Sequence, residues 1–426
     1  MGSDRDGRDY LSSSRPGTGR IGKRSLEELR ETFRHELFDL SIPLWRRDGV
    51  DWESGGYATS KTVDPADAAG WPYLDDAGNV RSANKKLYHQ GRILWLYSHL
   101  YNQVEKDDCF LRAATNGYEF LDSHCRDDTY NWMTEVTREG ACVVGFHNII
   151  ANIYMTLGLA EYYRATRDSS VLEAAKKSAY RIAEILYSNH YQAEGHSPFY
   201  PVTDSYREPG TRRLGYWLHY LNALSTLLRY SPDSGLEKIA RNVVRNILRH
   251  HYREDLKLPY EFLQRDFTPY PRDYLADDYL RAVDGFHSIE AAWMTMDEAL
   301  RVGSREMFRE AMEMGRLLLE KTYLERDGMQ GLVRFYWPDE RDPFARSEIL
   351  GPYVMKEVFV FLLLAVEHTG ADWAVEWMDR TFSYSYETPI RFPYMDTLHN
   401  VRGLLFGLQI LDRMIDRNGK VSDFLR

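Results

Sequence analysis

Residues 282–300 read AVDGFHSIEAAWMTMDEAL, and this stretch decides the fold. Apolar side chains recur in it every three or four residues, which predicts a helix; they are Ile289, Ala292, Trp293, Met296 and Leu300. His287 and Glu290 lie near its start, three residues apart and so on one face. Unpaired N–H groups and the positive dipole of a helix start can fix the tautomer of an imidazole. The pair predicts either chemistry or a histidine satisfied by a glutamate at a helix cap. Asp284 lies three residues before His287 and Asp396 three before His399, so each Asp is expected to cap its helix.

Composition bounds the class of protein. The chain has 426 residues, 43% of them hydrophobic, and is rich in rings that line sugar pockets or fill helical cores, with 30 Tyr, 18 Phe and 10 Trp. A net charge of −10 argues against general binding to nucleic acid or an anionic membrane. Cys109, Cys125 and Cys142 lack C-x-x-C spacing, so we expect buried, reduced thiols. With no secretory signal and no apolar run of membrane-spanning length, we expect a cytoplasmic monomer or homodimer.

A repeated order of segments predicts the architecture. A polar-faced helix, an irregular loop and a more apolar helix recur six times, and one landmark residue lies at or near the start of each apolar helix, namely Arg92, His147, His219, His287, Met355 and His399. A closed ring would bury these helices and aim their N-termini at one end. The prediction is an all-α (α/α)6 barrel of six helical hairpins, with short β-hairpins in the loops at the active-site end. An open helical solenoid is the structural alternative.

The ends of this repeat set the predicted domain. Ser25 and Glu28 have the spacing of a capping box at the start of the first helix. The preceding residues 1–24 are rich in Gly, Ser, Arg and Asp, which predicts a disordered tail. We therefore expect a single catalytic domain over residues 25–426.

The available chemistry is narrowed by what the sequence lacks. It contains no H-E-x-x-H, no G-x-S-x-G, no P-loop and no G-x-G-x-x-G. We therefore expect no metal and no cofactor. Histidines near the inner-helix starts remain, and imidazoles suit removal of a proton from a carbon next to a carbonyl. Arg92, in YHQGRILW, could stabilise the resulting oxyanion, although an arginine there is also a common structural ion-pair partner.

Several motifs together resemble those of the N-acylglucosamine 2-epimerase family, which includes cellobiose 2-epimerases and aldose–ketose isomerases acting on mannose and sulfoquinovose. The motifs are DWESGGY, HQGRILWLYS, LAEYYRATRD, WLHYLNAL, FHSIEAAW and LHNVRGLL. The resemblance implies proton transfer at C2 of an opened reducing sugar, through a cis-enediolate and without metal. It implies that His287 and His399 are the acid–base pair and that Arg92 stabilises the enediolate. It also implies that His219 assists ring opening and that Glu290 partners the first catalytic histidine.

The chain departs from the family pattern in regions that contact substrate. Phe286 precedes His287 where relatives often have Gly, Asn222 replaces a Glu, and the fifth inner helix reads PYVMKE, retaining Glu357. The sugar and the choice between a 2-epimer and a ketose product therefore stay open. Candidate sugar-contacting residues are Trp52, Tyr57, His147, Trp217, Asn222, Tyr353, Glu357 and Tyr394.

Two other classes of function remain. A glycoside hydrolase or polysaccharide lyase on the same barrel would use two carboxylates, with candidates Asp51, Glu53, Asp204 and Asp284. A sugar-binding protein that has lost turnover is the other. For the epimerase or isomerase, the expected partner is a small-molecule sugar.

Overall fold

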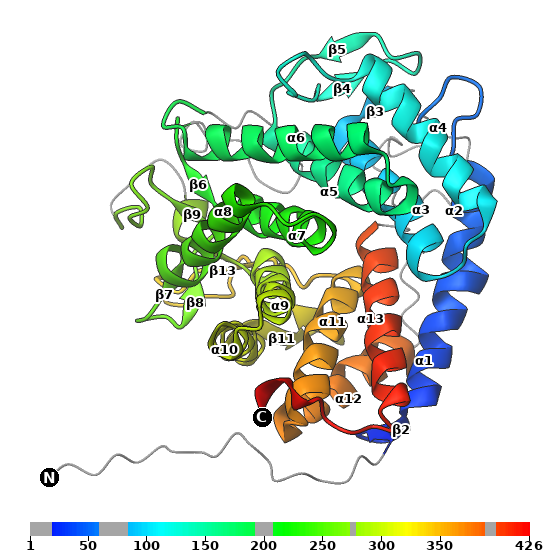
Figure 1. Cartoon of the computed structure of the whole chain (residues 1–426). Helices are drawn as coiled ribbons and strands as arrows, with labels where there is room; N and C mark the ends of the chain where they lie inside the picture. Colours follow the sequence, from blue (N-terminus) through cyan, green and yellow to red (C-terminus); the bar gives the residue numbers. More distant parts are fainter. Residues whose placement is uncertain (1–18, 59–83, 192–207, 273–277, 388–397) are drawn as a thin grey trace, which may run out of the picture.

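Six helices form an inner ring in the described part of the chain (Figure 1). The computed structural model describes residues 19–58, 84–191, 208–272, 278–387 and 398–426, without the side chains of Asp48, Pro352 and Tyr353. The inner helices are α3 (Leu87–Gln103), α5 (Ile149–Thr166), α7 (Leu214–Tyr230), α9 (Gly285–Val302), α11 (Pro352–Thr369) and α13 (Leu398–Asp416). Each packs on the next, and α13 packs on α3, so the ring is closed. The closed barrel is confirmed, and the open solenoid is wrong.

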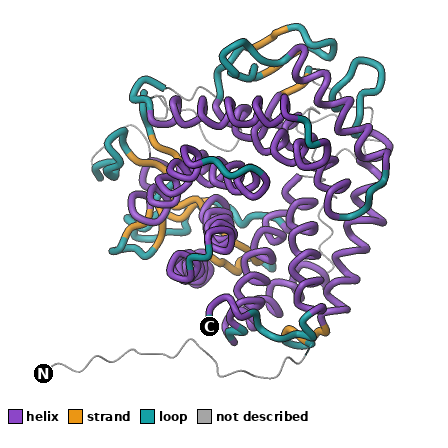
Figure 2. Tube along the Cα trace, in the orientation of Figure 1, coloured by secondary structure: helices purple, strands orange, loops and turns teal. Residues whose placement is uncertain are grey.

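An outer layer of helices covers the ring (Figures 1 and 2). Its members are α1 (Leu26–Arg34), η1 (His35–Ser41), α2 (Ile42–Asp48), α4 (Asp108–His124), α6 (Ser169–Tyr187), α8 (Ser234–Arg245), η3 (Asn246–His251), α10 (Arg305–Thr322) and α12 (Asp372–Glu387). Short 3-10 turns lie at η4 (Asp278–Arg281) and η5 (Asp423–Leu425). The outer helices bury one face each. In α1 that face is Leu26, Leu29 and Phe33, and the predicted Ser25–Glu28 capping box is present.

The inner helices are buried on all sides because each lies between two neighbours, the outer layer and the barrel axis. In α5, every residue from Ala151 to Tyr162 is buried. The sequence of a fully buried helix is apolar with little periodicity, which explains the apolar runs in this chain. Side chains that face the axis near the N-terminal ends can be polar only if they find partners there.

Short strands lie in the segments between the helices, and some of them join neighbouring hairpins at the start of the inner helices. They are β1 (Arg20–Ile21), β2 (Arg24–Ser25), β3 (Lys85–Lys86), β4 (Glu135–Val136), β5 (Cys142–Val144), β6 (Arg212–Arg213), β7 (Tyr252–Arg253), β8 (Leu258–Pro259), β9 (Phe262–Leu263), β10 (Val283–Asp284), β11 (Tyr323–Arg326), β12 (Met329–Leu332) and β13 (Phe335–Tyr336). Strands β3, β6 and β10 directly precede α3, α7 and α9, and each pairs antiparallel with a strand of the next hairpin's loop, β4, β9 and β13 respectively. The predicted β-hairpins are confirmed in β4–β5, β7–β8 and β11–β12.

The described residues ahead of Ser25 already pack against the barrel. Strands β1 and β2 pair with each other, Ile21 is 1% exposed, and the Lys23 N–H donates to the Asp379 carboxylate of α12. The residues just before the capping box, which the sequence predicted to be part of a disordered tail, are therefore packed against the barrel.

The cysteines differ from the sequence-based expectation. All three are free thiols, but Cys142 is exposed and Cys109 half-buried, so the prediction of buried thiols holds for Cys125 alone. Cys142 is exposed because β5 projects from the barrel as the outermost strand of its sheet. Among the described residues, no helix has the length and apolar content that a membrane crossing requires.

Helices α3 and α5 approach so closely that their contact requires glycine. A β carbon added at Gly91 would lie 2.5 Å from the backbone carbon of Tyr154 and 2.7 Å from the backbone nitrogen of Met155. Across the same contact, a β carbon at Gly158 would lie 2.6 Å from the Gly91 carbonyl oxygen. Backbone atoms cannot rotate away, so this contact fixes the spacing of two helices that carry site residues.

We expect Gly91→Ala to destabilise the protein. Helix propensity favours alanine over glycine by about 1 kcal/mol, whereas overpacking typically costs about 1–3 kcal/mol. A fall in melting temperature would therefore show that overpacking outweighs helix propensity. Thermal unfolding followed by circular dichroism measures this. The control is Gly145→Ala, where an added β carbon meets nothing within 4 Å. An unchanged or raised melting temperature for Gly91→Ala would contradict the close contact.

Candidate active site

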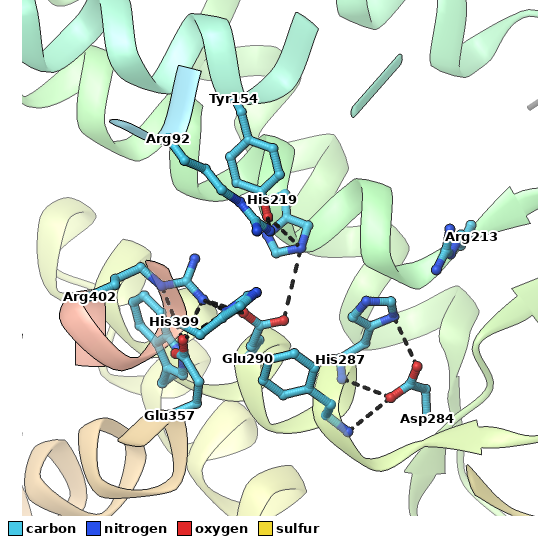
Figure 3. A network of polar contacts seen from close by, with 12 residues as sticks. Arg92, Tyr154, Arg213, His219, Asp284, His287, Glu290, Glu357, His399 and Arg402 are labelled. Atoms are coloured by element: carbon cyan, nitrogen blue, oxygen red, sulfur yellow. Dashed lines mark hydrogen bonds and ion pairs between the residues drawn. The ribbon is translucent and has the colours of Figure 1, made fainter. Parts of the chain in front are cut away.

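The inner helices present one polar layer near their N-terminal ends (Figure 3). The sixth residue of each of the first five inner helices belongs to it, and Arg402, the fifth residue of α13, completes it. The five are Arg92, Tyr154, His219, Glu290 and Glu357. His287 and His399 lie closer to the starts of their helices. Equivalent positions on six helices of a ring converge, so residues far apart in sequence form one cluster.

One part of the cluster is a chain from Arg92 to His219. The Arg92 guanidinium donates to the Tyr154 hydroxyl and lies 4.0 Å from the centre of that ring. The Tyr154 hydroxyl lies 3.1 Å from Nε2 of His219. Burial lowers the pKa of His219 well below its usual value, although Glu290 opposes this, so the imidazole is neutral at pH 7. Among the described residues, no carboxylate pairs with Arg92, so its charge is available to an anion.

A second part is a buried arginine between two carboxylates. Arg402 donates to Glu290 and, at 2.6 Å, to Glu357, while the Trp293 indole N–H donates to Glu357 at 2.9 Å. Burial opposes ionisation of Glu290, but the charge of Arg402 and a hydrogen bond with His399 hold its pKa well below the usual range. Burial likewise opposes the charge of Arg402, yet Glu357 and Glu290 raise its pKa. Both ions therefore persist in the interior.

His399 lies at the edge of this ion pair. Its Nδ1 is 3.3 Å from Glu357, 3.4 Å from Glu290 and 3.1 Å from a guanidinium nitrogen of Arg402. The Phe286 ring is edge-on to His399, with centroids 4.9 Å apart, and stacks on His287 at 6.2 Å. Phe286, one of the departures from the family pattern, therefore contacts both histidines.

His287 is held by two carboxylates on the other side. Its Nδ1 lies 2.9 Å from Glu261 and 3.3 Å from Asp284. Asp284 is also the predicted N-cap of α9, because it accepts the N–H groups of Phe286 and His287, and it pairs with Arg334 at 3.1 Å. A β carbon at Gly215 of α7 would lie 2.7 Å from the His287 ring. Glycine at that position leaves room for the imidazole.

Among the described residues, three sets of side chains have ligand atoms close enough to hold a metal ion. They are His219, His287 and Glu290; Glu261, Asp284 and His287; and Glu290, Glu357 and His399. Every carboxylate in them already pairs with an arginine, since Arg402 pairs with both Glu290 and Glu357, Arg213 with Glu261, and Arg334 with Asp284. These guanidinium groups weaken the attraction of the sets for a cation.

Six of the predicted site residues lie in one cluster. Arg92, His219, His287, Glu290, Glu357 and His399 belong to the cluster. The carboxylate hydrogen-bonded to His287 is Glu261, whereas Glu290 contacts His219, His399 and Arg402.

The predicted sugar contacts are only partly compatible with the structure. Tyr57 is fully buried and stacks on Tyr97, and Trp217 is 1% exposed and packs on Tyr187 and Phe267, so both predictions are corrected because these rings serve the core. Trp52 is 59% exposed on the first loop, His147 is half-buried just before α5, and Asn222 is buried one turn beyond His219. The Tyr353 side chain and Tyr394 lie outside the described residues, as do Asp204 and Asp396.

Five residues of the site were not predicted. Arg402 and Tyr154 lie at the layer position of their helices, so counting from each helix start could have found them. The other three lie in or beside short strands, where the sequence carries no comparable signal, and they are Glu261, Arg213 and Arg334.

Comparisons with known proteins give the class and then the family. The closed helical barrel is the fold that this chain shares with solved sugar epimerases. A sugar epimerase from a ruminal bacterium matches with a TM-score of 0.71 at 20% identity, covering 89% of this chain and 98% of that one. The cellobiose 2-epimerase of Bacillus thermoamylovorans matches with 0.70 at 20% identity, covering 90% and 99%. A D-mannose isomerase matches with 0.65 at 14% identity, covering 92% and 97%.

The sequence places the chain in one family. The pattern of N-acylglucosamine 2-epimerase (GlcNAc 2-epimerase) matches residues 70–391, which include Arg92, His219 and His287 and end before His399. Cellobiose 2-epimerase of Dictyoglomus turgidum is 27% identical over 305 residues, 69% of this chain and 71% of that protein. Cellobiose 2-epimerase of Ruminococcus albus is 26% identical over 361 residues, 79% and 81%. The chain belongs to the N-acylglucosamine 2-epimerase family and is an enzyme of the isomerase class.

The buried His251, which contacts the segment that holds Glu261, makes the free energy of unfolding depend on pH. Its Nδ1 lies 2.8 Å from the Tyr260 carbonyl oxygen, next to Glu261, and burial lowers its pKa to about 4. An unfolded histidine titrates near 6.5, so only the unfolded chain gains this proton between pH about 6.5 and 4. This histidine therefore leaves the free energy of unfolding unchanged above pH about 6.5 and lowers it by about 1.4 kcal/mol for each pH unit below that value.

We expect His251→Gln to remove this contribution to the pH slope. Glutamine does not titrate, and its amide can still donate to the Tyr260 carbonyl. The free energy of unfolding, measured with urea between pH 7.5 and 5, should therefore fall less steeply in the variant than in the wild type. The buried histidines His89 and His219, whose pKa values are lowered in the same direction, leave a residual slope. Equal slopes in the two proteins would contradict a neutral, buried His251.

Proposed function

We propose that the protein is a sugar 2-epimerase or aldose–ketose isomerase that moves the C2 proton of an opened reducing mono- or disaccharide through a cis-enediolate. The observation that carries the proposal is that two imidazoles from α9 and α13 flank one phenylalanine ring, each with carboxylates at its Nδ1. A neutral imidazole whose Nδ1 carries the proton can accept a proton at Nε2. His287 and His399 are therefore the proposed acid–base pair.

The remaining polar residues support the same chemistry. Removal of the C2 proton places negative charge on the carbonyl oxygen, and a guanidinium without a carboxylate partner suits that charge. Arg92 meets this description within the described residues. His219, neutral and hydrogen-bonded to Tyr154, can donate or accept a hydrogen bond as the sugar ring opens. Glu290 stays ionised and helps to place His399 and Arg402.

The candidate carboxylates for hydrolysis that the structure describes have structural partners. Asp51 pairs with the buried Lys85 at 3.2 Å and with Arg138 at 2.8 Å, and Glu53 pairs with the same Arg138. Asp284 caps α9. Solved glycoside hydrolases share the barrel, including a β-1,3-1,4-glucanase with a TM-score of 0.59 at 9% identity, which is a likeness of fold alone. These contacts favour the epimerase or isomerase over a hydrolase.

The decisive experiment is incubation with a panel of reducing mono- and disaccharides in D2O. We expect deuterium at C2 of the substrate or product, with a 2-epimer or a ketose identifying the outcome. His287→Asn and His399→Asn should each reduce turnover by about 10²–10⁴-fold, because each removes an acid–base group. Nuclear magnetic resonance of the sugars measures exchange and product together.

The matched control for these variants is His99→Asn. His99 is also a buried histidine of an inner helix, 4% exposed, but it contacts Gln409 and Glu161 outside the cluster. We expect it to keep turnover. Near-normal turnover in both active-site variants would reject the histidine mechanism. Chain cleavage without C2 exchange would indicate a hydrolase or lyase, and binding without either would indicate a sugar-binding protein.

Activity is expected to survive chelation. The proposed acid, base and oxyanion partner are all side chains, so dialysis against EDTA should leave the rate of C2 exchange unchanged. A rate that falls on dialysis and returns with one divalent ion would overturn the metal-free mechanism.

A further inference from the structure

Glu261 is a buried carboxylate that the acid–base pair does not by itself explain. It is 0% exposed, lies between β8 and β9, and is outside the inner-helix layer. Its Oε1 is 2.9 Å from Nδ1 of His287 and 2.8 Å from Nε of Arg213. A charged group with no access to water has a large desolvation cost, so its retention calls for a specific partner.

The backbone holds Glu261 between two inner helices. Its carbonyl accepts the N–H of Leu214, the first residue of α7, and its own N–H donates to the Ala282 carbonyl just before β10. The neighbouring Tyr260 N–H donates to the His251 carbonyl. Glu261 is thus fixed to both α7 and α9, and its carboxylate has little freedom relative to the His287 ring.

The charge state of Glu261 sets the tautomer of His287. Burial alone would raise the pKa of Glu261, but the hydrogen bonds from His287 and Arg213 lower it to about 2, so the carboxylate is ionised at neutral pH. An ionised carboxylate accepts hydrogen bonds only, so Nδ1 of His287 must be the donor. The lone pair then lies on Nε2, the nitrogen that a base in the proposed reaction would use.

The groups that face His287 are mostly carboxylates. Facing it are Glu261 from the β8–β9 turn, Asp284 from the cap of its own helix, Glu290 one turn further along α9, and the neutral His219 ring of α7 at a centroid distance of 6.1 Å. Arg213 and Arg334 act on the first two carboxylates. Glu261 makes the shortest of the described contacts to Nδ1.

We propose that Glu261 is a positioning residue for proton transfer by His287. It fixes the tautomer with the basic nitrogen at Nε2 and stabilises the imidazolium that forms, and Arg213 orients its carboxylate. The proposal rests on the proposed function, because it assigns to Glu261 a role in the acid–base step of that reaction.

The test compares Glu261→Gln with the wild-type full-length protein on the sugar that shows C2 exchange. Loss of the correct tautomer and of a supporting carboxylate typically reduces rates by about 10- to 10⁴-fold. We expect a kcat loss in that range with little change in KM. The acid limb of the kcat/KM profile should move to lower pH, because protonation of the base loses a nearby negative charge. Glu261→Asp, which keeps the charge and shortens the reach, should recover part of the rate.

The matched control is Glu161→Gln. Glu161 is another buried carboxylate, 2% exposed, whose oxygen lies 3.4 Å from Nδ1 of His99. The same substitution there disturbs a buried histidine–carboxylate pair at a distance from the cluster. We expect a similar change in melting temperature, with kcat and the pH profile unchanged.

A second measurement does not depend on turnover. Nitrogen-15 spectra of the histidines should show His287 with the proton on Nδ1 in the wild type and a mixture of tautomers in Glu261→Gln. A folded Glu261→Gln with wild-type kcat and acid limb, or a wild type with the proton on Nε2, would overturn the role of Glu261. A wild type that exchanges C2 hydrogen in no sugar would instead overturn the proposed function, and the nitrogen spectra would still decide the tautomer.

Discussion

The hydrogen bonds that tie the start of one inner helix to the loop of the next hairpin are the constraint on which the site depends. An inner helix is buried on all sides, so its first N–H groups cannot be left to water. The N–H of Leu87 donates to the Thr134 carbonyl, that of Leu214 to Glu261, and that of Gly285 to Arg334. Each bond satisfies a helix start and also fixes the angular position of the neighbouring helix. These bonds therefore fix the inner helices relative to one another at the end of the barrel where the polar residues lie.

This fixed arrangement of the helices allows a cluster of charged side chains to lie in the interior. Glu290, Glu357, Glu261 and Asp284 supply four negative charges, and Arg92, Arg402, Arg213 and Arg334 supply four positive ones, a formal sum of zero when the histidines are neutral. Arg92 alone of these four arginines lacks a carboxylate partner within the described residues, while Arg402 serves two. The balance compensates the cost of burial and leaves one guanidinium available to a substrate oxygen.

The sequence predicted what depends on local pattern. The α9 stretch, the six hairpins and the caps at Ser25 and Asp284 follow from spacing within a helix or its first turn, and these predictions are confirmed. Glu261 could not be predicted, because its role arises when two short strands pair across hairpins. Tyr57 and Trp217 illustrate the opposite error. An aromatic ring reads the same in a sugar site and in a core, and only the packing against Tyr97 or Phe267 separates the two.

The two histidines occupy similar places on their helices but face different charges. Nδ1 of His287 has two carboxylates within 3.3 Å, and their arginines lie beyond them. Nδ1 of His399 has carboxylates at 3.3 and 3.4 Å together with the Arg402 guanidinium at 3.1 Å. A positive charge on His287 is therefore better compensated than one on His399. Pairs of titratable groups whose surroundings differ in this way can divide acid and base roles. In the proposed reaction this asymmetry favours His287 as the group that first takes the C2 proton.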